Sequence, residues 1–302
     1  MSVAPPLVLS DVRQSAADRV TRGIAIALAA YLTVVLLPLW RDFRTTGAPI
    51  PLATHAAMLG YVLLLLGARG AGWRPALDWL TLTIGPLMYV ELRWIIAGTG
   101  MPHHDAMIVR WEQALFPSNP SATLAPRLHL PLLSEVLHFA YASYYLLIYL
   151  PPIALYVTGK RDAFVKTVLA LTTVYGACFI TYALFPVDGP RYLVGPAAAP
   201  DGPVRRFVLA LLERGSSRGT AFPSSHVAAS LVSGLCALRY QRRVGLVVAP
   251  FVVALVIATV YGGFHYAVDA LVGVILGGLA WLASATLWSA AESRGVHTAT
   301  AA

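Results

Sequence analysis

The sequence predicts an all-α fold, a polytopic membrane helical bundle with about eight transmembrane helices. Of the 302 residues, 58% are hydrophobic and only 12% are charged, whereas a soluble domain usually carries roughly 25% charged residues. The mean hydropathy of +0.68 agrees with this balance. The polar side chains are too few to cover so much apolar surface, so we expect lipid to cover it.

Eight apolar runs have about the length of a membrane span, which needs roughly 20 residues to cross the hydrocarbon core. We find no separate soluble domain between them. We therefore expect a single transmembrane domain over residues 19–289, with disordered cytoplasmic ends at 1–18 and 290–302. The predicted spans lie near residues 23–40, 52–68, 76–97, 134–157, 163–185, 224–239, 244–261 and 265–287.

The basic residues predict the topology. The formal net charge is +8, and much of it lies in short groups between apolar runs, such as Lys160–Arg161 and Arg242–Arg243. This pattern is typical of cytoplasmic loops under the positive-inside rule, and it does not favour a nucleic-acid partner. With both ends in the cytoplasm, the three irregular loops at 98–133, 186–223 and 261–264 share the extracytoplasmic face of a cell membrane.

Two charged residues, Glu91 and Arg93, lie near the end of the third predicted span. Charged side chains in a span are costly and usually face the protein interior or the interface. They indicate either a structural ion pair with another span or a role near a polar site. The sequence leaves both interpretations open.

The sixth predicted span begins with the segment Pro223-Ser224-Ser225-His226. Pro223 fits the first turn of a helix because its missing N–H is not needed there, and serines are typical at helix starts. Free backbone N–H groups at a helix start can bind phosphate, and His226 lies in that turn. The segment therefore predicts a phosphate-binding helix start.

The eighth predicted span begins with His265 and Asp269, which are four residues apart and share one helix face. A carboxylate there can accept the ring N–H of His265. This fixes the tautomer and makes the other ring nitrogen a better nucleophile. Because the sixth and eighth spans both run inward, we expect His226 and His265 to meet at the outer boundary.

A third polar segment lies at the outer end of the fifth predicted span and contains Arg191. Its guanidinium can present a two-pronged hydrogen-bonding fork to phosphate oxygens. The alternative is an arginine that snorkels to the membrane interface. A lone membrane histidine or an H-x-x-x-D pattern is weak evidence by itself. Taken together on one face, these residues predict a phosphate site.

At these residues the sequence resembles the type-2 phosphatidic acid phosphatase and vanadium haloperoxidase superfamily. Pro223–His226 look like its P-S-[GS]-H motif, and His265 with Asp269 looks like the H-x-x-x-D end of its third motif. Within the superfamily the chain is most similar to the inositol phosphorylceramide synthase branch. That similarity rests on Phe222–His226, on His265-Tyr266-x-x-Asp269, and on the loop from His104-Asp105 through Trp111-Glu112 to Leu115-Phe116. The resemblance implies a six-helix phosphatase-like core within the bundle.

The sequence departs from the superfamily pattern at two cation positions. Ala258 and Thr259 stand where the third motif normally has Ser-Arg, and no Lys-x6-Arg-Pro motif is present. We expect Arg191 to bind phosphate in their place, with Arg218 as a weaker candidate.

The resemblance implies a two-step transfer through a phosphohistidine. His265 would attack phosphorus, oriented by Asp269, while His226 would protonate the leaving oxygen and then deprotonate the acceptor. Arg191 and the N–H groups near Ser224 and Ser225 would stabilise the transition-state oxygens.

No cofactor and no metal is implied. The only cluster that suggests a metal is His103, His104 and Asp105 in the first long loop. We interpret it as a loop cluster without a metal.

The motifs do not choose the acceptor, because water would give a phosphatase and a lipid or polyol hydroxyl would give a phosphotransferase. A site at the outer boundary suits an amphiphile entering from the membrane lipid, so the expected substrate is a lipid phosphate or phosphodiester. A transporter would usually bind near the bilayer midplane. A transporter and a non-catalytic scaffold remain the alternatives to an enzyme.

Overall fold

The computed structural model describes residues 9–68 and 70–300, and every regular element in them is a helix. The all-α membrane bundle is therefore confirmed. In addition to a short 3-10 turn at Ala71–Trp73, the α-helices are α1 (Leu9–Thr46), α2 (Pro49–Gly67), α3 (Arg74–Thr99), α4 (Asp105–Leu115), α5 (Pro120–Arg127), α6 (Pro131–Ala142), α7 (Tyr144–Val157), α8 (Arg161–Leu184), α9 (Pro190–Leu193), α10 (Pro203–Gly215), α11 (Ser225–Tyr240), α12 (Arg242–Tyr261) and α13 (Ala267–Thr300).

The number of spans differs from the prediction, although all eight predicted runs are helical. Six helices in the described residues are long and apolar enough to cross a membrane, namely α1, α2, α3, α8, α12 and α13. The pair α6–α7, which bends by 46°, adds a seventh if it is one span. The remaining run is α11, whose 16 residues cover about 24 Å, less than a hydrocarbon core of about 30 Å. It packs against α7, α8, α12 and α13 inside the bundle, so neighbouring helices rather than lipid surround it.

Both ends of the domain are longer than predicted. Residues 9–18 belong to α1 and residues 290–300 to α13, where we expected disorder. The reason is packing, since Ala16 and Ala17 are fully buried and the Arg19 Nε donates a hydrogen bond to the carbonyl of Ala291 at 3.0 Å. Residues 1–8 and 301–302 lie outside the described part. A single domain over residues 19–289 stays a prediction.

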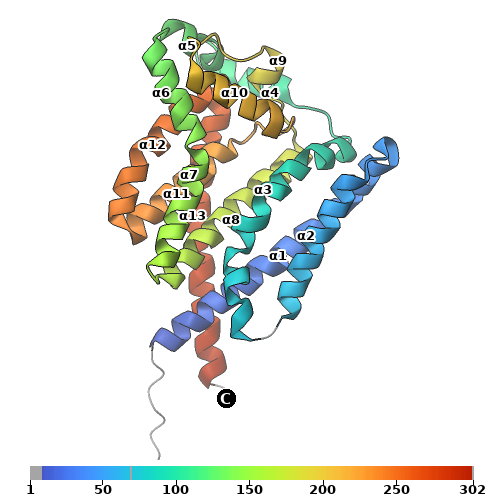
Figure 1. Ribbon diagram of the computed structural model, residues 1–302, viewed down its shortest axis with the longest axis vertical. Coiled ribbons are helices and arrows are strands. Elements are labelled where there is room, and N and C mark those ends of the chain that lie inside the picture. Colours follow the sequence, from blue (N-terminus) through green and yellow to red (C-terminus); the bar gives the residue numbers. More distant parts are fainter. Residues whose placement is uncertain (1–8, 69, 301–302) are drawn as a thin grey trace, which may run out of the picture.

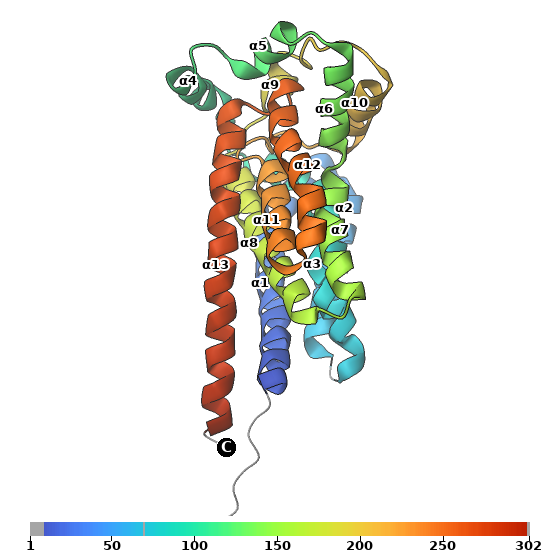
Figure 2. The ribbon, with the colours of Figure 1, turned by 90° about the vertical axis from the view of Figure 1, so that its left-hand side faces the viewer.

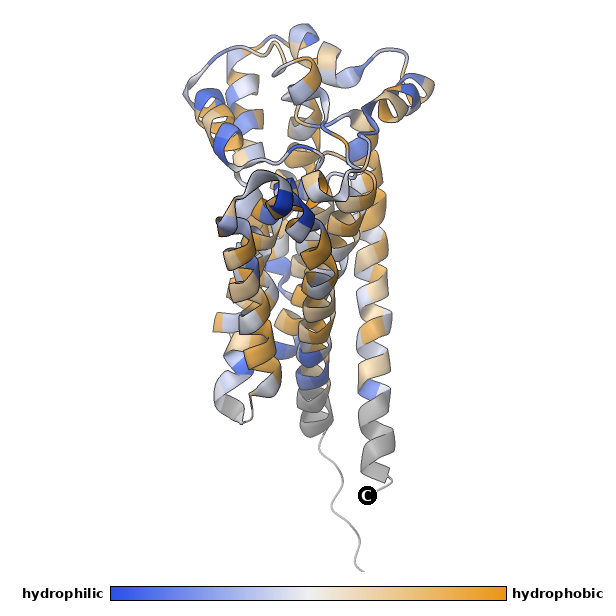
Figure 3. Ribbon diagram, turned by 90° about the vertical axis from the view of Figure 1, so that its right-hand side faces the viewer, coloured by the Kyte–Doolittle hydropathy of each residue, from blue (hydrophilic) through white to orange (hydrophobic). Residues whose placement is uncertain are grey.

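The connecting segments gather at one end of the bundle. Figures 1 and 2 show α4, α5, α9 and α10 at the top, and the start of α1 and the end of α13 at the bottom. We call α4, α5, α9, α10 and their connections the cap region. Figure 3 shows mostly hydrophobic residues along the long helices below it, with more hydrophilic residues in the cap region. The three irregular loops therefore share one end, as the alternating spans predict.

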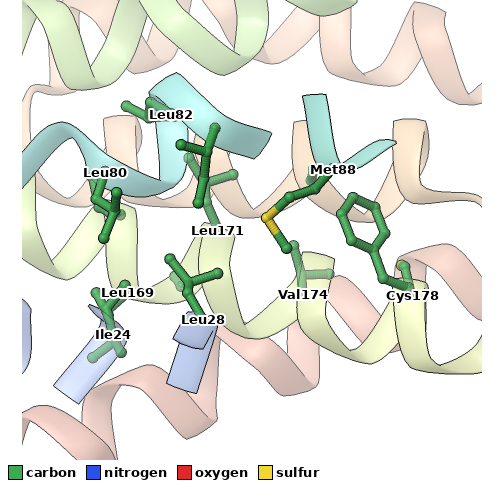
Figure 4. Packing of buried hydrophobic residues seen from close by; sticks show 14 of the residues in the cluster. Ile24, Leu28, Leu80, Leu82, Met88, Leu169, Leu171, Val174 and Cys178 are labelled. Atoms are coloured by element: carbon green, nitrogen blue, oxygen red, sulfur yellow. The ribbon is translucent and has the colours of Figure 1, made fainter. Parts of the chain in front are cut away.

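The main core lies where α1, α3 and α8 pack against one another. Figure 4 shows a part of this core from close by, to which each of these helices contributes aliphatic side chains and α8 adds Cys178, one of two buried free cysteines in the described residues. The labelled residues are Ile24, Leu28, Leu80, Leu82, Met88, Leu169, Leu171, Val174 and Cys178. This core fixes α8, which leads directly into the cap region.

A buried polar contact explains Glu91. The His55 Nδ1 lies 3.0 Å from a carboxylate oxygen of Glu91, and the His55 Nε2 lies 2.8 Å from the carbonyl oxygen of Leu32. Both ring nitrogens face acceptors, so both can donate only when the ring is an imidazolium. The structural ion pair, which joins α1, α2 and α3, is therefore the correct one of the two interpretations for Glu91.

Two glycines bring α13 close to α11. A Cβ on Gly273 would lie 2.8 Å from the carbonyl oxygen of Ser224, and a Cβ on Gly277 would lie 2.8 Å from that of Ala228. Small residues four apart allow two membrane helices to pack backbone against backbone. This contact fixes the start of α11 relative to the start of α13.

We predict that Gly273→Ala lowers the stability of the bundle by about 1–3 kcal/mol, because the added methyl group meets backbone atoms that cannot rotate away. Gly278→Ala is the matched control on the same helix, since nothing lies within 4 Å of its added Cβ. Thermal unfolding in detergent measures both. Equal thermal unfolding midpoints for the two variants would contradict the close contact between α11 and α13.

Candidate active site

His265 lies in the turn between α12 and α13, two residues before α13 begins. Its backbone N–H donates to the carbonyl of Thr259 at 3.0 Å, and its ring Nδ1 lies 2.9 Å from the carbonyl oxygen of Ala221. A carbonyl oxygen only accepts, so Nδ1 carries the proton and Nε2 of the neutral ring carries the lone pair. The fold therefore leaves the free lone pair of the His265 ring on Nε2.

Asp269 supports this turn in a different way from the one predicted. Its Oδ2 lies 3.6 Å from Nδ1 of His265, which is longer than a hydrogen bond, and it accepts the backbone N–H of Tyr266 at 2.8 Å. Because α13 begins at Ala267, Asp269 is the third residue of the helix and closes its N-terminus as in a capping box. The acceptor of the ring proton is therefore Ala221, and Asp269 adds a buried carboxylate beside it.

His226 lies in the first turn of α11, as expected. Its ring stacks on Tyr141 with centroids 5.1 Å apart and packs against Tyr144 at 4.2 Å. The Tyr141 hydroxyl lies 3.4 Å from Nε2 of His226. The centroid of the His265 ring is 5.9 Å away, so the predicted meeting of the two histidines is confirmed.

A cavity of about 40 Å³ lies beside the two histidines. It exceeds the roughly 10–15 Å³ that one water needs. Arg191 lines it, donates from an Nη atom to the Ser216 hydroxyl, and stacks over Tyr192 with 4.3 Å to the ring centroid. The predicted juxtaposition of Arg191 with the histidines is therefore confirmed.

Ser217 lines the same cavity. Its side chain is 3% exposed, and its hydroxyl has no hydrogen-bond partner among the described residues. A buried hydroxyl without a partner costs free energy unless something bonds to it. This group is therefore suited to a phosphate oxygen.

The serines of the Pro-Ser-Ser-His segment have structural partners. The helix α11 begins at Ser225 with Ser224 as N-cap, so Pro223 precedes the first turn. The backbone N–H of Ser224 donates to the carbonyl of Asp269 at 3.1 Å, and that of Ser225 to the Tyr182 hydroxyl at 3.2 Å. The Ser224 hydroxyl accepts the N–H of Val227. The N–H groups expected to bind phosphate are therefore occupied, which corrects that part of the prediction.

Arg218 lies outside the cavity between the histidines. Its side chain is 66% exposed, with an Nη atom 4.0 Å from Asp188. It lines a neighbouring recess together with Arg93 and His103. The structure therefore brings Arg191, and not Arg218, to the histidines.

Two carboxylates on one face of α4 hold the loops that carry the site. Asp105 accepts the backbone N–H groups of Asp188 and Gly189 at 3.0 and 2.9 Å, just before Arg191. Glu112 accepts those of Ala267 and Val268 at 3.0 and 2.9 Å, just after His265. Burial raises the pKa of the Glu112 carboxyl above its ordinary value, although both N–H donors oppose the shift.

Of the sequence cluster His103, His104 and Asp105, the structure brings His103 and Asp105 together with Asp188, and the ligand atoms of these three residues lie within 4.8 Å of one another. Each carboxylate already has donors, because Asp105 binds two backbone N–H groups and Asp188 binds the N–H of Gly219 at 2.9 Å. The His103 Nδ1 lies 2.9 Å from Asp188. His104 instead stacks on Phe185 at 4.0 Å. These hydrogen bonds hold the loops together, and they account for the positions of the two carboxylates.

The sequence interpretation did not find Tyr141, Ser217 or the Ala221 carbonyl. Tyr141 lies within the fourth predicted apolar run, and Ser217 lies in a polar loop. The contact between Tyr141 and His226 joins residues 85 positions apart in the sequence, and the contact between Ala221 and His265 joins residues 44 positions apart. No local pattern carries that information.

We predict that Glu112→Gln destabilises the fold by about 1–3 kcal/mol, because an amide keeps one acceptor oxygen and leaves the second backbone N–H without an acceptor. Turnover should fall with it, since the turn carrying His265 loses its support. Thermal unfolding and activity assays in detergent measure these effects. Glu213→Gln, at an exposed position on α10, is the control, and an identical response of the two variants would contradict this role.

Comparison with known proteins agrees with this site. The family model of the PAP2 superfamily matches residues 106–283, which is more than half of the chain and includes His226, His265, Asp269 and Arg191. No curated protein and no solved structure matches the chain. Because the match covers more than half of its length, the chain belongs to the PAP2 superfamily.

Proposed function

We propose that the protein transfers the phosphoryl group of a lipid phosphate or phosphodiester to a hydroxyl acceptor, in the manner of an inositol phosphorylceramide synthase. The observation that carries this proposal is the pair His226 and His265, with ring centroids 5.9 Å apart beside a cavity that Arg191 also lines. Membership of the PAP2 superfamily supports phosphatase or phosphotransferase chemistry on lipids.

The proposed reaction has two steps. In the first, Nε2 of His265 forms a bond to phosphorus while the bond from phosphorus to the lipid oxygen breaks, and His226 gives that oxygen a proton. In the second, the acceptor oxygen attacks phosphorus, His226 takes the acceptor's proton, and the N–P bond breaks. The hydrogen bond from Nδ1 to Ala221 at 2.9 Å supports this assignment, because it keeps the lone pair on Nε2.

Arg191 and Ser217 are the proposed donors to the phosphate oxygens. The guanidinium carries several N–H donors in a planar fork, and the buried Ser217 hydroxyl lacks a partner in the described part of the chain. These donors take the role that the occupied N–H groups of Ser224 and Ser225 cannot fill. Arg191 also compensates for Ala258 and Thr259 at the third-motif positions.

We further propose that the cap region faces the extracytoplasmic side. The opposite end of the bundle holds the basic groups at Arg19, Arg22, Lys160–Arg161 and Arg242–Arg243. This distribution is the one that the positive-inside rule favours.

We expect His265→Ala to abolish activity, because no other group can form the phosphoryl bond. The assay offers a lipid labelled at phosphorus to the purified protein, with and without polyol and ceramide acceptors. Label in a new lipid only when acceptor is present supports transfer, whereas release of free phosphate without acceptor indicates the alternative, a lipid phosphatase that uses water. Full activity of His265→Ala in both assays would refute the mechanism.

Ser217→Ala serves as the companion variant in the same assays. It should raise KM more than it lowers kcat if the hydroxyl binds a phosphate oxygen already in the ground state. Arg191→Lys removes the fork but keeps the charge, and should reduce kcat as well.

The orientation predicts that Val194→Cys, at a position 78% exposed in the cap region, reacts with an impermeant thiol reagent in intact cells. Lys160→Cys at the other end should react only after lysis. Both native cysteines are buried and give a low background. The reverse labelling pattern would place the site on the cytoplasmic side.

A further inference from the structure

Two partly open apolar grooves between the helices share wall residues, and one of them has His226 in its wall. The first has a volume of about 170 Å³ between α3, α7 and α8, with His226 in its wall. The second has a volume of about 640 Å³ between α1, α3, α8 and α13. Both are lined by Thr81, Gly85, Tyr175 and Phe179. Together they lead from His226 towards the end of the bundle where the chain termini lie.

The larger groove has the length of a hydrocarbon chain segment. Along α8 its wall extends from Leu169 to Ile180, which is about 16 Å at the rise of an α-helix. This is roughly half of a 30 Å hydrocarbon core. Its volume lies within the range of about 300–1,000 Å³ that is usual for ligand sites.

Four hydroxyl groups in the walls bond to one another in pairs and not to the grooves. The hydroxyls of Thr81 and Thr172 lie 2.7 Å apart, and those of Tyr144 and Tyr175 lie 2.8 Å apart. Ordered water in a cavity needs two to four polar partners, which these paired groups do not offer. The surface that remains is mostly apolar, with Arg19 at the end of the larger groove farthest from His226, and it suits a hydrocarbon occupant.

Tyr31 is the exception in the larger groove. Its hydroxyl is the one in that wall without a hydrogen-bond partner in the part of the chain described here. A single donor does not make a water site, so the apolar character of the groove holds.

We propose that the two grooves hold one long hydrocarbon chain of the substrate, which leaves the site beside His226 and continues past Gly85 between α1, α8 and α13. This inference rests on the proposed function, since it places the attached phosphate between His226 and His265. The occupant is the substrate's own tail because the first groove has a catalytic histidine in its wall. A chain lying there is therefore continuous with a head group at the reaction centre.

Gly85 determines how far the chain reaches. It lies midway along α3 in the walls of both grooves, and nothing lies within 4 Å of a Cβ built on it. A side chain at this position therefore enters open space where the grooves adjoin, without meeting the backbone. A short chain ends before Gly85, and a long one must pass it.

The kinetic test compares hexyl phosphate with hexadecyl phosphate as substrates of the purified full-length protein in detergent. Gly85→Leu should lower kcat/KM for hexadecyl phosphate about tenfold or more, which is the loss expected when roughly two methylenes lose apolar contact. The value for hexyl phosphate should stay within about twofold, and Gly60→Leu, on α2 outside both grooves with an equally open Cβ, should change neither. Equal effects of Gly85→Leu on both substrates would overturn the proposal. The smaller Gly85→Ala, expected to have an intermediate effect, replaces Gly85→Leu if the latter does not fold.

A binding test does not depend on turnover. Hexadecyl phosphate with a photoreactive diazirine at its terminal carbon is crosslinked to His265→Ala, which keeps the grooves but lacks the nucleophile. Label should appear on α1 and α8 residues that line the larger groove, such as Gly23, Ala27 and Gly176, and should be lost when Gly85→Leu is added. Label spread over lipid-facing residues, or label insensitive to Gly85→Leu, would refute the tail site. If the wild-type protein turns over neither alkyl phosphate but crosslinks as expected, the proposed function fails while the tail site stands.

Discussion

Irregular backbone close to a membrane needs acceptors for its N–H groups, because lipid offers none. The cap region meets this constraint with carboxylates from neighbouring helices. Asp105 binds the N–H groups of residues 188 and 189, and Glu112 binds those of residues 267 and 268. Glu135 binds those of residues 204 and 205 at the start of α10. The first two of these contacts fix the functional residues. Arg191 follows the peptide groups that Asp105 binds, and His265 precedes those that Glu112 binds.

This solution changes how the site can bind an anion. The start of a helix usually attracts phosphate through its free N–H groups and its dipole. Here Glu112 and Asp269 occupy the first N–H groups of α13, while Asp269, Tyr182 and Ser224 provide acceptors at the start of α11. Two negative side chains therefore already balance the positive end of α13. Under the proposed function the phosphate donors therefore come from side chains, and Arg191 and Ser217 both line the cavity.

The sequence predicted the parts that depend on local pattern. Hydrophobic runs located all eight long helical segments, and alternating direction brought His226 and His265 to one end. It did not predict α4, α5 and α10 inside the long loops, because these helices have only 11, 8 and 13 residues and do not form apolar runs of span length. The sixth run was counted as a span because a helix enclosed by other helices is as apolar as one that faces lipid. The partner of the His265 ring could not be predicted, because Ala221 contributes a carbonyl group, which every residue has.

The first three helices lie outside the matched region of the superfamily, which begins at residue 106, yet they contribute to the site. Tyr89 on α3 lines the cavity of the histidines, and Gly85 lies one turn away in the walls of the two apolar grooves. The matched region supplies both histidines, Asp269 and Arg191, whereas α1 and α3 supply one wall of the space in which a lipid tail would lie. Because α1, α3 and α8 share one buried core, that wall is rigidly tied to the helix that leads into the cap region. Under the proposed function, the matched region supplies the groups that move the phosphate, while α1 and α3 add to the walls that shape the substrate. A change of side-chain volume in the groove-lining part of α1 or α3 would then alter which lipid fits without replacing a histidine or Arg191.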